Sequence, residues 1–341
     1  MIALASLRQR WSGLLGTAAT LAVAVAVLTV SGLLLLSAQP ELPARYAGTP
    51  VLVRPVPPAD PEAFTDPRPW SADAADALAV RLARLDGVAA AIPEHGFYAQ
   101  LVRNGRVLAG ARDAVGWSAA SLGGYALRSG QPPAGPGEVA VDAGLGIPAG
   151  APVTLLTARG AETFTVTGTA DGPGIWVSDA LARSRAPGVR VIGLLIHGTA
   201  DAAAVSAAAS GIVGADGEVL DGGRRAAVEP VADARTRWIG MQVLTAVSAL
   251  GAFVSVFIVA STVAFATRRR HREIALLRLL GAAPRQVRRM IFGEVTVVGL
   301  AGGLAGAVVG LAAAAPIGRW LVRTGFEPAT FDLTYPPAVP V

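Results

Sequence analysis

The chain has 341 residues, of which 52% are hydrophobic and only 16% charged, with a mean hydropathy of +0.51. A soluble domain carries about 25% charged residues, so this composition excludes a wholly soluble protein. There is no cysteine, and all 29 basic residues are arginine. Disulfides and cysteine zinc sites are therefore excluded, as are lysine Schiff bases and a P-loop, which needs its lysine for the phosphates of ATP.

The net charge of +5 is distributed unevenly along the chain. Residues 41–237 carry 17 Arg against 20 acidic residues, whereas residues 1–40 and 268–294 together carry 10 Arg against Glu273 and Glu294. Both basic segments are short and adjoin long uncharged stretches. We interpret the basicity as a signal of membrane topology and predict no nucleic-acid partner.

Three stretches without any charge are long enough to cross a bilayer, which needs about 20 residues. They are residues 11–40, 238–267 and 295–318. Arginines precede the first stretch and separate the second from the third, so both basic segments are placed in the cytoplasm. We therefore predict a multi-pass plasma-membrane protein with a cytoplasmic N-terminus. A cleaved signal peptide is the alternative for the first stretch, whose apolar core exceeds the about 7–15 residues typical of one.

This topology divides the chain into six segments. They are an N-terminus with the first transmembrane helix at 1–40, an extracytoplasmic domain at 41–237, a second transmembrane helix at 238–267, a cytoplasmic loop at 268–294, a third transmembrane helix at 295–318 and an external C-terminal segment at 319–341. The predicted fold class is an α-helical bundle of three spans with a large α+β extracytoplasmic domain.

The extracytoplasmic domain is predicted to be α+β because helix and strand signals alternate along it. Ser71 is a suitable N-cap for a helix to about Leu85, and residues 201–210 indicate a second helix, N-capped by Thr199 or Asp201. Hairpins are predicted about Asn104-Gly105 and Arg159-Gly160. Further strands are predicted at residues 51–53, 138–141, 175–177 and 189–196, with a β-rich lobe at about 118–180 inserted between two mixed segments.

No catalytic or metal-binding pattern stands out in this domain. His95, His197 and His271 are scattered, so no pair has metal-ligand spacing, and no G-x-S-x-G motif occurs. The carboxylates are dispersed among arginines as on a solvated surface, although the sequence leaves a glycosidase-like carboxylate pair open. We expect no catalytic residue, no bound cofactor and no metal in this chain.

The cytoplasmic loop is predicted to contain two helices with a break between Gly281 and Pro284. The first helix extends the second span, and Pro284 suits the first turn of the next helix, where its missing N–H is not needed. The second helix has an apolar stripe of Val287, Met290 and Ile291. Such a helix either rests on anionic lipid or docks on a cytoplasmic partner, and composition leaves both open.

The third span contains two rows of small residues spaced four apart. One row is Gly302, Gly306 and Gly310, and the other is Gly299, Gly303 and Ala307. Small residues at this spacing let helix backbones approach closely in lipid, so we predict a helix-packing face. The alternative is that GC-rich coding scatters glycine and alanine without a packing role.

The loop carries the most specific motif of the chain. The residues R-R-R-H-R-E-I-A-L-L-R-L-L-G-A-A-P-R-Q-V-R-R-M-I-F-G-E, followed by G-L-A-G-G-L-A-G-A-V-V-G, closely resemble the FtsX-like permease family, which includes the MacB and LolC/LolE types. More weakly, the S-G-x-x-P, E-V-x-V and V-G patterns between residues 129 and 168 resemble the MacB-like periplasmic core domain.

The resemblance implies a permease subunit of an ABC transporter complex. Such a subunit couples ATP hydrolysis by a separate ABC-type ATPase to movements that export or extract a substrate, and it pairs with a second permease protomer as a homo- or heterodimer within membrane lipid. ATP would be bound by the partner, so the chain itself would not be an enzyme. Carried over by position, the ATPase-contacting residues are Glu273, Gly281, Pro284, Arg285, Gln286, Arg288 and Arg289, with Glu294 at the base of the third span.

The sequence departs from the family pattern in two places. Ala283 stands where the family often has Thr or Ser, which would N-cap the second loop helix. The family also has a fourth span, which would begin at about residue 336, so we expect this chain to be truncated or to continue beyond Val341. Two alternatives to a transport role follow: a non-transporting mechanotransmission regulator of a cell-wall hydrolase or sensor, and a non-functional fragment of a larger permease. The substrate is not indicated.

Overall fold

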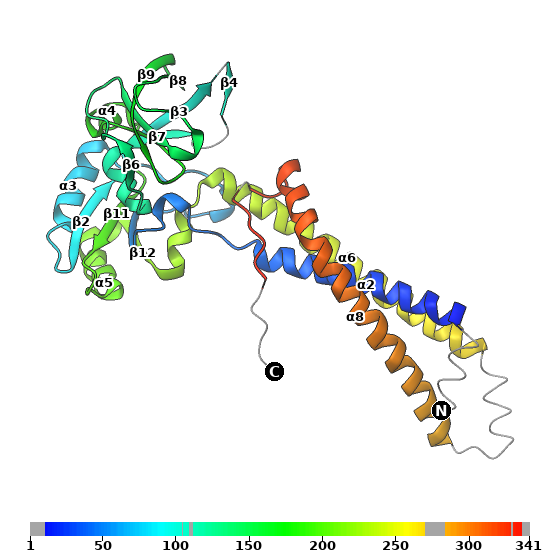
Figure 1. The fold of residues 1–341 in the computed structure, drawn as a ribbon. Coiled ribbons are helices and arrows are strands. Elements are labelled where there is room, and N and C mark those ends of the chain that lie inside the picture. The colour runs from blue at the N-terminus through cyan, green and yellow to red at the C-terminus, as the bar shows by residue number, and fades with distance from the viewer. Residues whose placement is uncertain (1–10, 104, 109–111, 270–283, 329, 336–341) are drawn as a thin grey trace. The chain divides into compact units, whose positions relative to one another are not determined.

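The computed structural model describes residues 11–103, 105–108, 112–269, 284–328 and 330–335. The chain forms two compact units (Figure 1). One is Pro40–Val231, and the other combines Met1–Gln39 with Ala232–Val341. The first unit has two lobes built around different sheets, and the second consists of long helices.

The first lobe is a four-stranded antiparallel sheet covered by two helices. Its strands are β1 (Val51–Pro55), β2 (Val88–Pro93), β11 (Ile192–Ile196) and β12 (Gly217–Asp221), in the order β12-β1-β11-β2. Helix α3 (Ala72–Leu82) connects β1 to β2, and α5 (Ala202–Val213) connects β11 to β12. This βαββαβ arrangement is ferredoxin-like, and we call it the ferredoxin-like lobe.

The helices of this lobe begin where local capping predicts. The Ser71 Oγ accepts the Ala74 N–H at 3.2 Å, and the Asp201 carboxylate accepts the Ala203 N–H at 3.0 Å. Each cap satisfies an N–H that the first helical turn leaves unpaired. Both predicted caps are confirmed, with Asp201 as the N-cap of α5. One face of the sheet packs against the two helices through a core that includes Val51, Val53, Leu78, Leu82, Ile192, Leu194, Val205 and Val213.

The second lobe is a small closed barrel inserted between β2 and β11. Its strands are β3 (Gly96–Arg103), β4 (Arg106–Val107), β5 (Asp113–Gly116), β6 (Leu127–Gly130), β7 (Glu138–Asp142), β8 (Pro152–Thr157), β9 (Gly160–Ala170) and β10 (Ile175–Val177). Strands β3, β8, β9, β7, β10 and β5 pair in sequence and return to β3. Closure leaves these strands without a free edge. The interior includes Phe97, Leu101, Leu155, Phe164, Val166 and Ile175.

Both predicted hairpins are confirmed by the strand register. Val102 pairs with Val107 across the first, and Thr157 pairs with Gly160 across the second. The predicted start of the β-rich lobe, at about residue 118, was wrong because the barrel begins at Gly96. The barrel strand β3 also pairs with β8, more than fifty residues later in the chain, and a local pattern carries no signal for such a partner.

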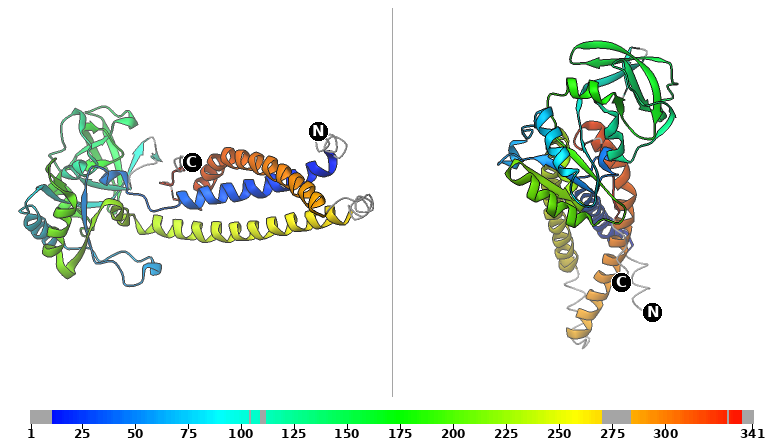
Figure 2. Two further views of the ribbon diagram at one scale, coloured as in Figure 1. Left: turned by 90° about the horizontal axis from the view of Figure 1, so that it is seen from below. Right: turned by 90° about the vertical axis from the view of Figure 1, so that its left-hand side faces the viewer.

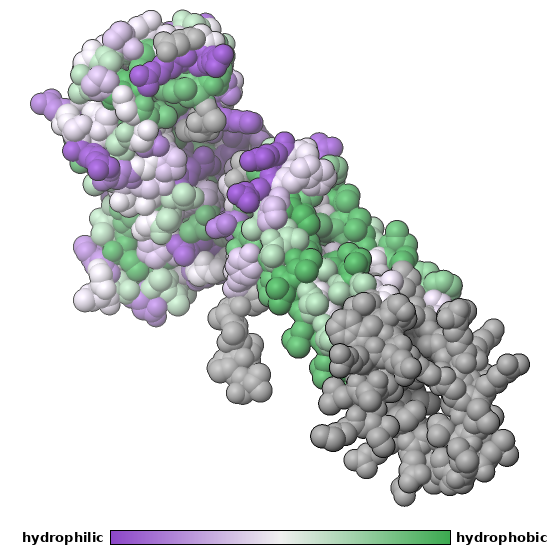
Figure 3. All heavy atoms as spheres, turned by 45° about the vertical axis from the view of Figure 1, so that its right-hand side comes forward, coloured by the Kyte–Doolittle hydropathy of each residue, from purple (hydrophilic) through white to green (hydrophobic). Residues whose placement is uncertain are grey.

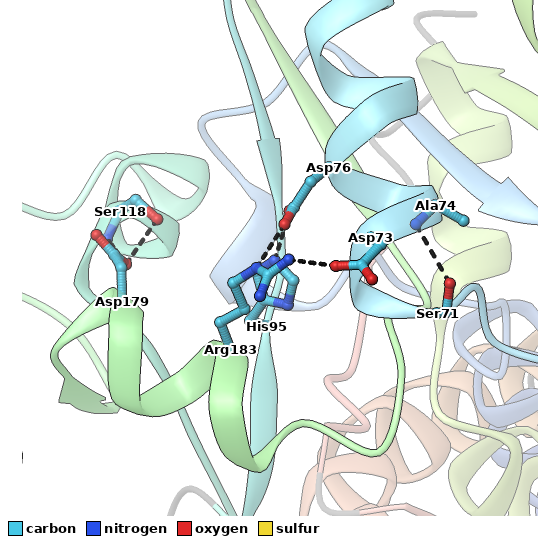
Figure 4. Close-up of polar contacts among 8 residues, drawn as sticks. All are labelled: Ser71, Asp73, Ala74, Asp76, His95, Ser118, Asp179 and Arg183. Atoms are coloured by element: carbon cyan, nitrogen blue, oxygen red, sulfur yellow. Dashed lines mark hydrogen bonds and ion pairs between the residues drawn. The ribbon is translucent and has the colours of Figure 1, made fainter.

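Helix α4 (Asp179–Arg185) and a 3-10 segment (Trp117–Gly123) join the two lobes. Leu122 of this segment packs with Tyr46, Leu52 and Leu220 on the sheet face opposite α3 and α5. On the other side, an ion-pair cluster connects α4 to α3 (Figure 4). Its contacts are Arg183 Nη2 to Asp73 Oδ1 at 2.5 Å, Arg183 Nε to Asp76 Oδ2 at 2.6 Å and His95 Nε2 to Asp76 Oδ1 at 2.8 Å. Burial raises the pKa of Asp76, but the hydrogen bonds from Arg183 and His95 outweigh burial and lower it below its ordinary value.

The second unit contains three long apolar helices, as the fold class predicted. They are α2 (Trp11–Ser37), α6 (Val231–Arg269) and α8 (Pro284–Thr324). Each includes a stretch long and apolar enough to cross a membrane: Ala18–Ser37, Val231–Val254 and Thr296–Thr324. In Figure 3 the described parts of these helices show mostly hydrophobic surface.

The helix boundaries differ from the predicted segments in two respects. Helix α6 begins at Val231, seven residues before the predicted start of the second span. Helix α8 is continuous from Pro284 to Thr324, so the predicted second loop helix and the third span are a single helix of 41 residues. No proline interrupts α8 before Pro316, and the polar residues at its start are good helix formers.

Candidate functional site: the long apolar helices

Helices α2 and α8 pack against each other between Gly302 and Gly318 of α8 (Figure 2). Their contact is built on one of the two glycine rows of α8. A Cβ added at Gly302 would lie 2.9 Å from the Ala18 carbonyl oxygen, and one added at Gly310 would lie 2.7 Å from the Thr29 Cβ. A Cβ at Gly306 would overlap the Ala22 carbonyl oxygen. Because these three residues have no side chain, the backbone of α8 can lie directly against the backbone of α2.

The other glycine row is placed differently. A Cβ added at Gly299 or Gly303 meets no heavy atom within 4 Å in the part of the chain that the structure describes. Residues one position apart on a helix point about 100° away from each other, so the two rows cannot both face α2. The geometry thus separates the five glycines named from the sequence into three that contact α2 and two that do not.

Some of the predicted ATPase-contacting residues lie among the described residues and others do not. Glu273 and Gly281 lie outside the described residues. Five others, Pro284, Arg285, Gln286, Arg288 and Arg289, lie in the first turns of α8, and Glu294 follows on the same helix. Pro284 is the first residue of α8, as predicted from its missing N–H. Six of the predicted residues are therefore brought onto one continuous helix with the glycine row.

Glu327 and Arg237 are buried charged residues that the sequence did not reveal. Glu327, three residues after the end of α8, is only 2% exposed. Burial raises the pKa of its carboxyl to about 7, although the nearby charge of Arg237 acts in the opposite direction. In the sequence, a single Glu after an apolar span is typical of a solvated loop residue. The one local signal of a fixed backbone is Pro328, which restricts the chain.

The ferredoxin-like lobe contains a groove of about 520 Å³. Its lining includes Trp70, Leu78, Arg81 and Ile212. Two polar side chains at its wall bond to backbone: Arg81 Nη2 donates to the Ile212 carbonyl at 2.9 Å, and Trp70 Nε1 donates to the Asp216 carbonyl at 3.2 Å. The Arg81 bond joins α3 to the end of α5. Among the described residues, no group of three or more His, Asp or Glu side chains could hold a metal ion.

Comparison with known proteins identifies the helical part of the chain. Residues 245–339 match the family model described as FtsX-like permease C-terminal. This match starts within α6 and includes the loop motif and all of α8. A comparison with curated protein sequences gives no match.

Two solved structures resemble the chain at low identity. One is the periplasmic region of MacB from Actinobacillus actinomycetemcomitans, with 11% identity, 51% of this chain and 90% of that chain covered, and a TM-score of 0.39. The other is a domain assigned to a permease protein from Porphyromonas gingivalis, with 10% identity, 54% and 94% covered, and a TM-score of 0.35. The α+β assignment rests instead on the strand order described above. The resemblance predicted from the loop motif is confirmed for residues 245–339, which are similar to the C-terminal domain of FtsX-like permeases.

Proposed function

We propose that this chain is the permease subunit of an ABC transporter complex. It binds a separate ABC-type ATPase, pairs with a second permease protomer in the membrane, and couples ATP hydrolysis in its partner to movement that exports or extracts a substrate. The observation that carries this proposal is the FtsX-like match over residues 245–339. The arginine distribution supports a cytoplasmic N-terminus and loop, with residues 41–237 on the other side of the membrane.

The composition supports an energy source in another chain. No lysine is present, so the chain cannot bind ATP through a P-loop of its own. In this proposal a partner ATPase acts mechanically on a part of this chain that lies on the cytoplasmic side. The loop at 268–294 holds eight arginines, which suit an acidic rim on a partner protein.

The continuity of α8 supplies a route for such a movement. A helix of 41 residues is about 60 Å long and carries a displacement at Pro284 to its far end. The row at Gly302, Gly306 and Gly310 places its middle in backbone contact with α2. A push on the start of α8 would therefore also move α2, whose C-terminal end continues into the extracytoplasmic unit.

The proposal is tested by reversing charge at the start of α8. We expect the double variant Arg285→Glu/Arg288→Glu to lose most of a co-expressed ABC-type ATPase when the full chain is purified in detergent, where no lipid surface competes. The matched control is Arg319→Glu/Arg323→Glu, which makes the same change on exposed residues at the opposite end of the same helix. Gly281→Val should also reduce recovery, because valine restricts the backbone angles available at the predicted break.

The outcome separates docking from lipid attraction. If Arg285→Glu/Arg288→Glu retains the ATPase as well as the parent does, the loop is a lipid-facing segment and the coupling proposal fails. If both double variants lose the ATPase equally, the effect is one of net charge, and the proposed contact fails as well.

A further inference from the structure

The segment that follows α8 crosses the ends of the three long apolar helices α2, α6 and α8. Helix α8 ends at Thr324, and Gly325 then takes a left-handed backbone conformation with φ of 77°. The Phe326 N–H bonds back to the Leu321 carbonyl at 3.0 Å, a common way of ending a helix. The turn directs the following residues across the helix ends. We call residues 325–328 and 330–335 the strap; it is red in Figure 1.

The strap contacts α2, α6 and α8. Ser37, the last residue of α2, forms two bonds with Thr334: its Oγ accepts the Thr334 N–H at 3.0 Å and donates to the Thr334 carbonyl at 3.3 Å. On α8, a Cβ added at Gly318 would lie 3.3 Å from the Phe331 ring. On α6, a Cβ at Gly240 would overlap the Phe326 carbonyl oxygen and lie 2.6 Å from Glu327 Oε1. Only glycine at residue 240 allows the strap to lie this close to α6.

Glu327 is the residue by which the strap is buried against α6. It is 2% exposed, and neither of its carboxylate oxygens has a hydrogen-bond partner among the described residues. An ionised carboxylate without hydrogen-bond donors is costly to bury, whereas the neutral acid loses much less on leaving water.

The charges around Glu327 are few. Arg237 of α6 is the charged residue that acts on it, and it favours the ionised form. The described stretch of α2 contains no charged residue, and Arg319 and Arg323 of α8 are exposed, as is Asp332 of the strap. Arg237 thus lowers the pKa of Glu327, whereas burial raises it.

We propose that the strap is a proton-operated latch on the helix ends that continue into the extracytoplasmic unit. With Glu327 neutral, the strap stays packed against Gly240 and holds α6 to α2 and α8. Loss of the Glu327 proton to water leaves a buried carboxylate without hydrogen bonds, which favours release of the strap into solvent. This inference concerns the chain alone and does not require the proposed ATPase coupling.

The pKa of Glu327 fixes the pH range of the latch. Burial raises this pKa from 4.5 to about 7, so the latched state binds the proton more tightly than the released state. Between these two values the released strap has already lost its proton while the latched one retains it. Each pH unit in this window therefore shifts the equilibrium about tenfold toward release, and the shift is complete above the pKa of the latched state.

The latch is tested by the distance between the strap and α6 in the full chain. The chain has no cysteine, so spin labels can be placed at Thr330→Cys and at Val254→Cys, both exposed. Pulsed electron paramagnetic resonance in detergent at pH 5 to 9 should give one narrow distance at low pH and loss of that peak above pH 7. Glu327→Gln, which is neutral at every pH, should keep the narrow distance throughout. Glu62→Gln, an exposed carboxylate in the other unit, is the matched control and should behave as the parent.

Several results would overturn the latch. A parent distance that does not change with pH would refute it, and so would pH dependence that persists in Glu327→Gln, or a strap that is released in Glu327→Gln at low pH. Gly240→Ala should lose the narrow distance at every pH, because its Cβ overlaps the Phe326 carbonyl; retention would refute the contact itself. Labels on α2 and α8 show whether a variant still folds. No ATPase is present, so failure here leaves the proposed coupling untouched.

Discussion

Replacing Gly306 with alanine should separate α2 from α8. The added Cβ would overlap the Ala22 carbonyl oxygen and lie 2.8 Å from the Val25 Cβ. Carbon atoms pack at about 3.5–4.0 Å, so the helices must move apart by about 0.7 Å or more. Because backbone forms one side of the clash, no rotamer change relieves it. A gap of this size forfeits about a quarter to a half of the dispersion energy of the contacts it opens. We expect a loss of about 1–3 kcal/mol in the free energy of unfolding.

The matched control lies three residues away on the same helix. A Cβ at Gly303 meets no described atom within 4 Å, and alanine is the better helix former, so Gly303→Ala should be neutral or stabilising by up to about 1 kcal/mol. Both variants are unfolded by SDS in mixed micelles and followed by energy transfer between dyes at Val23→Cys and Val308→Cys, which are exposed positions. Equal unfolding free energies for Gly306→Ala and Gly303→Ala would refute the assignment of the packing row.

Two further predictions concern the unit Pro40–Val231 and the membrane topology. Hydrogen bonds from Arg185 lower the pKa of Glu162 below its ordinary value of 4.5. The pair therefore stabilises the barrel fully above pH 4.5, and this contribution is lost as the pH falls through the lowered pKa. We expect the loss of stability between neutral and acidic pH, followed by the fluorescence of the buried Trp176, to be smaller in Glu162→Gln than in the parent. An identical loss in both would contradict the assignment. Reporter fusions at Gln100 and Ala282 should report opposite compartments, and the same compartment for both would refute the predicted topology.

Features that depend on neighbouring residues could be read from the sequence. The three uncharged stretches predict membrane helices because each residue in lipid must avoid charge, whatever its distant neighbours. The N-caps Ser71 and Asp201 and the hairpin at Arg159-Gly160 are local for a similar reason: their hydrogen bonds join residues only a few positions apart. The loop motif likewise lies within one continuous segment, which the family match confirms.

Features that depend on distant partners were decided only by the tertiary structure. The barrel closes because β3 pairs with β8 and β5 with β10, and nothing in any one strand specifies which partner it takes. The two glycine rows of α8 are equivalent in sequence, yet one contacts α2 and the other does not, because helix rotation is set by packing. Glu327 is buried for the same reason, since only the fold brings Gly240, almost ninety residues earlier, against it.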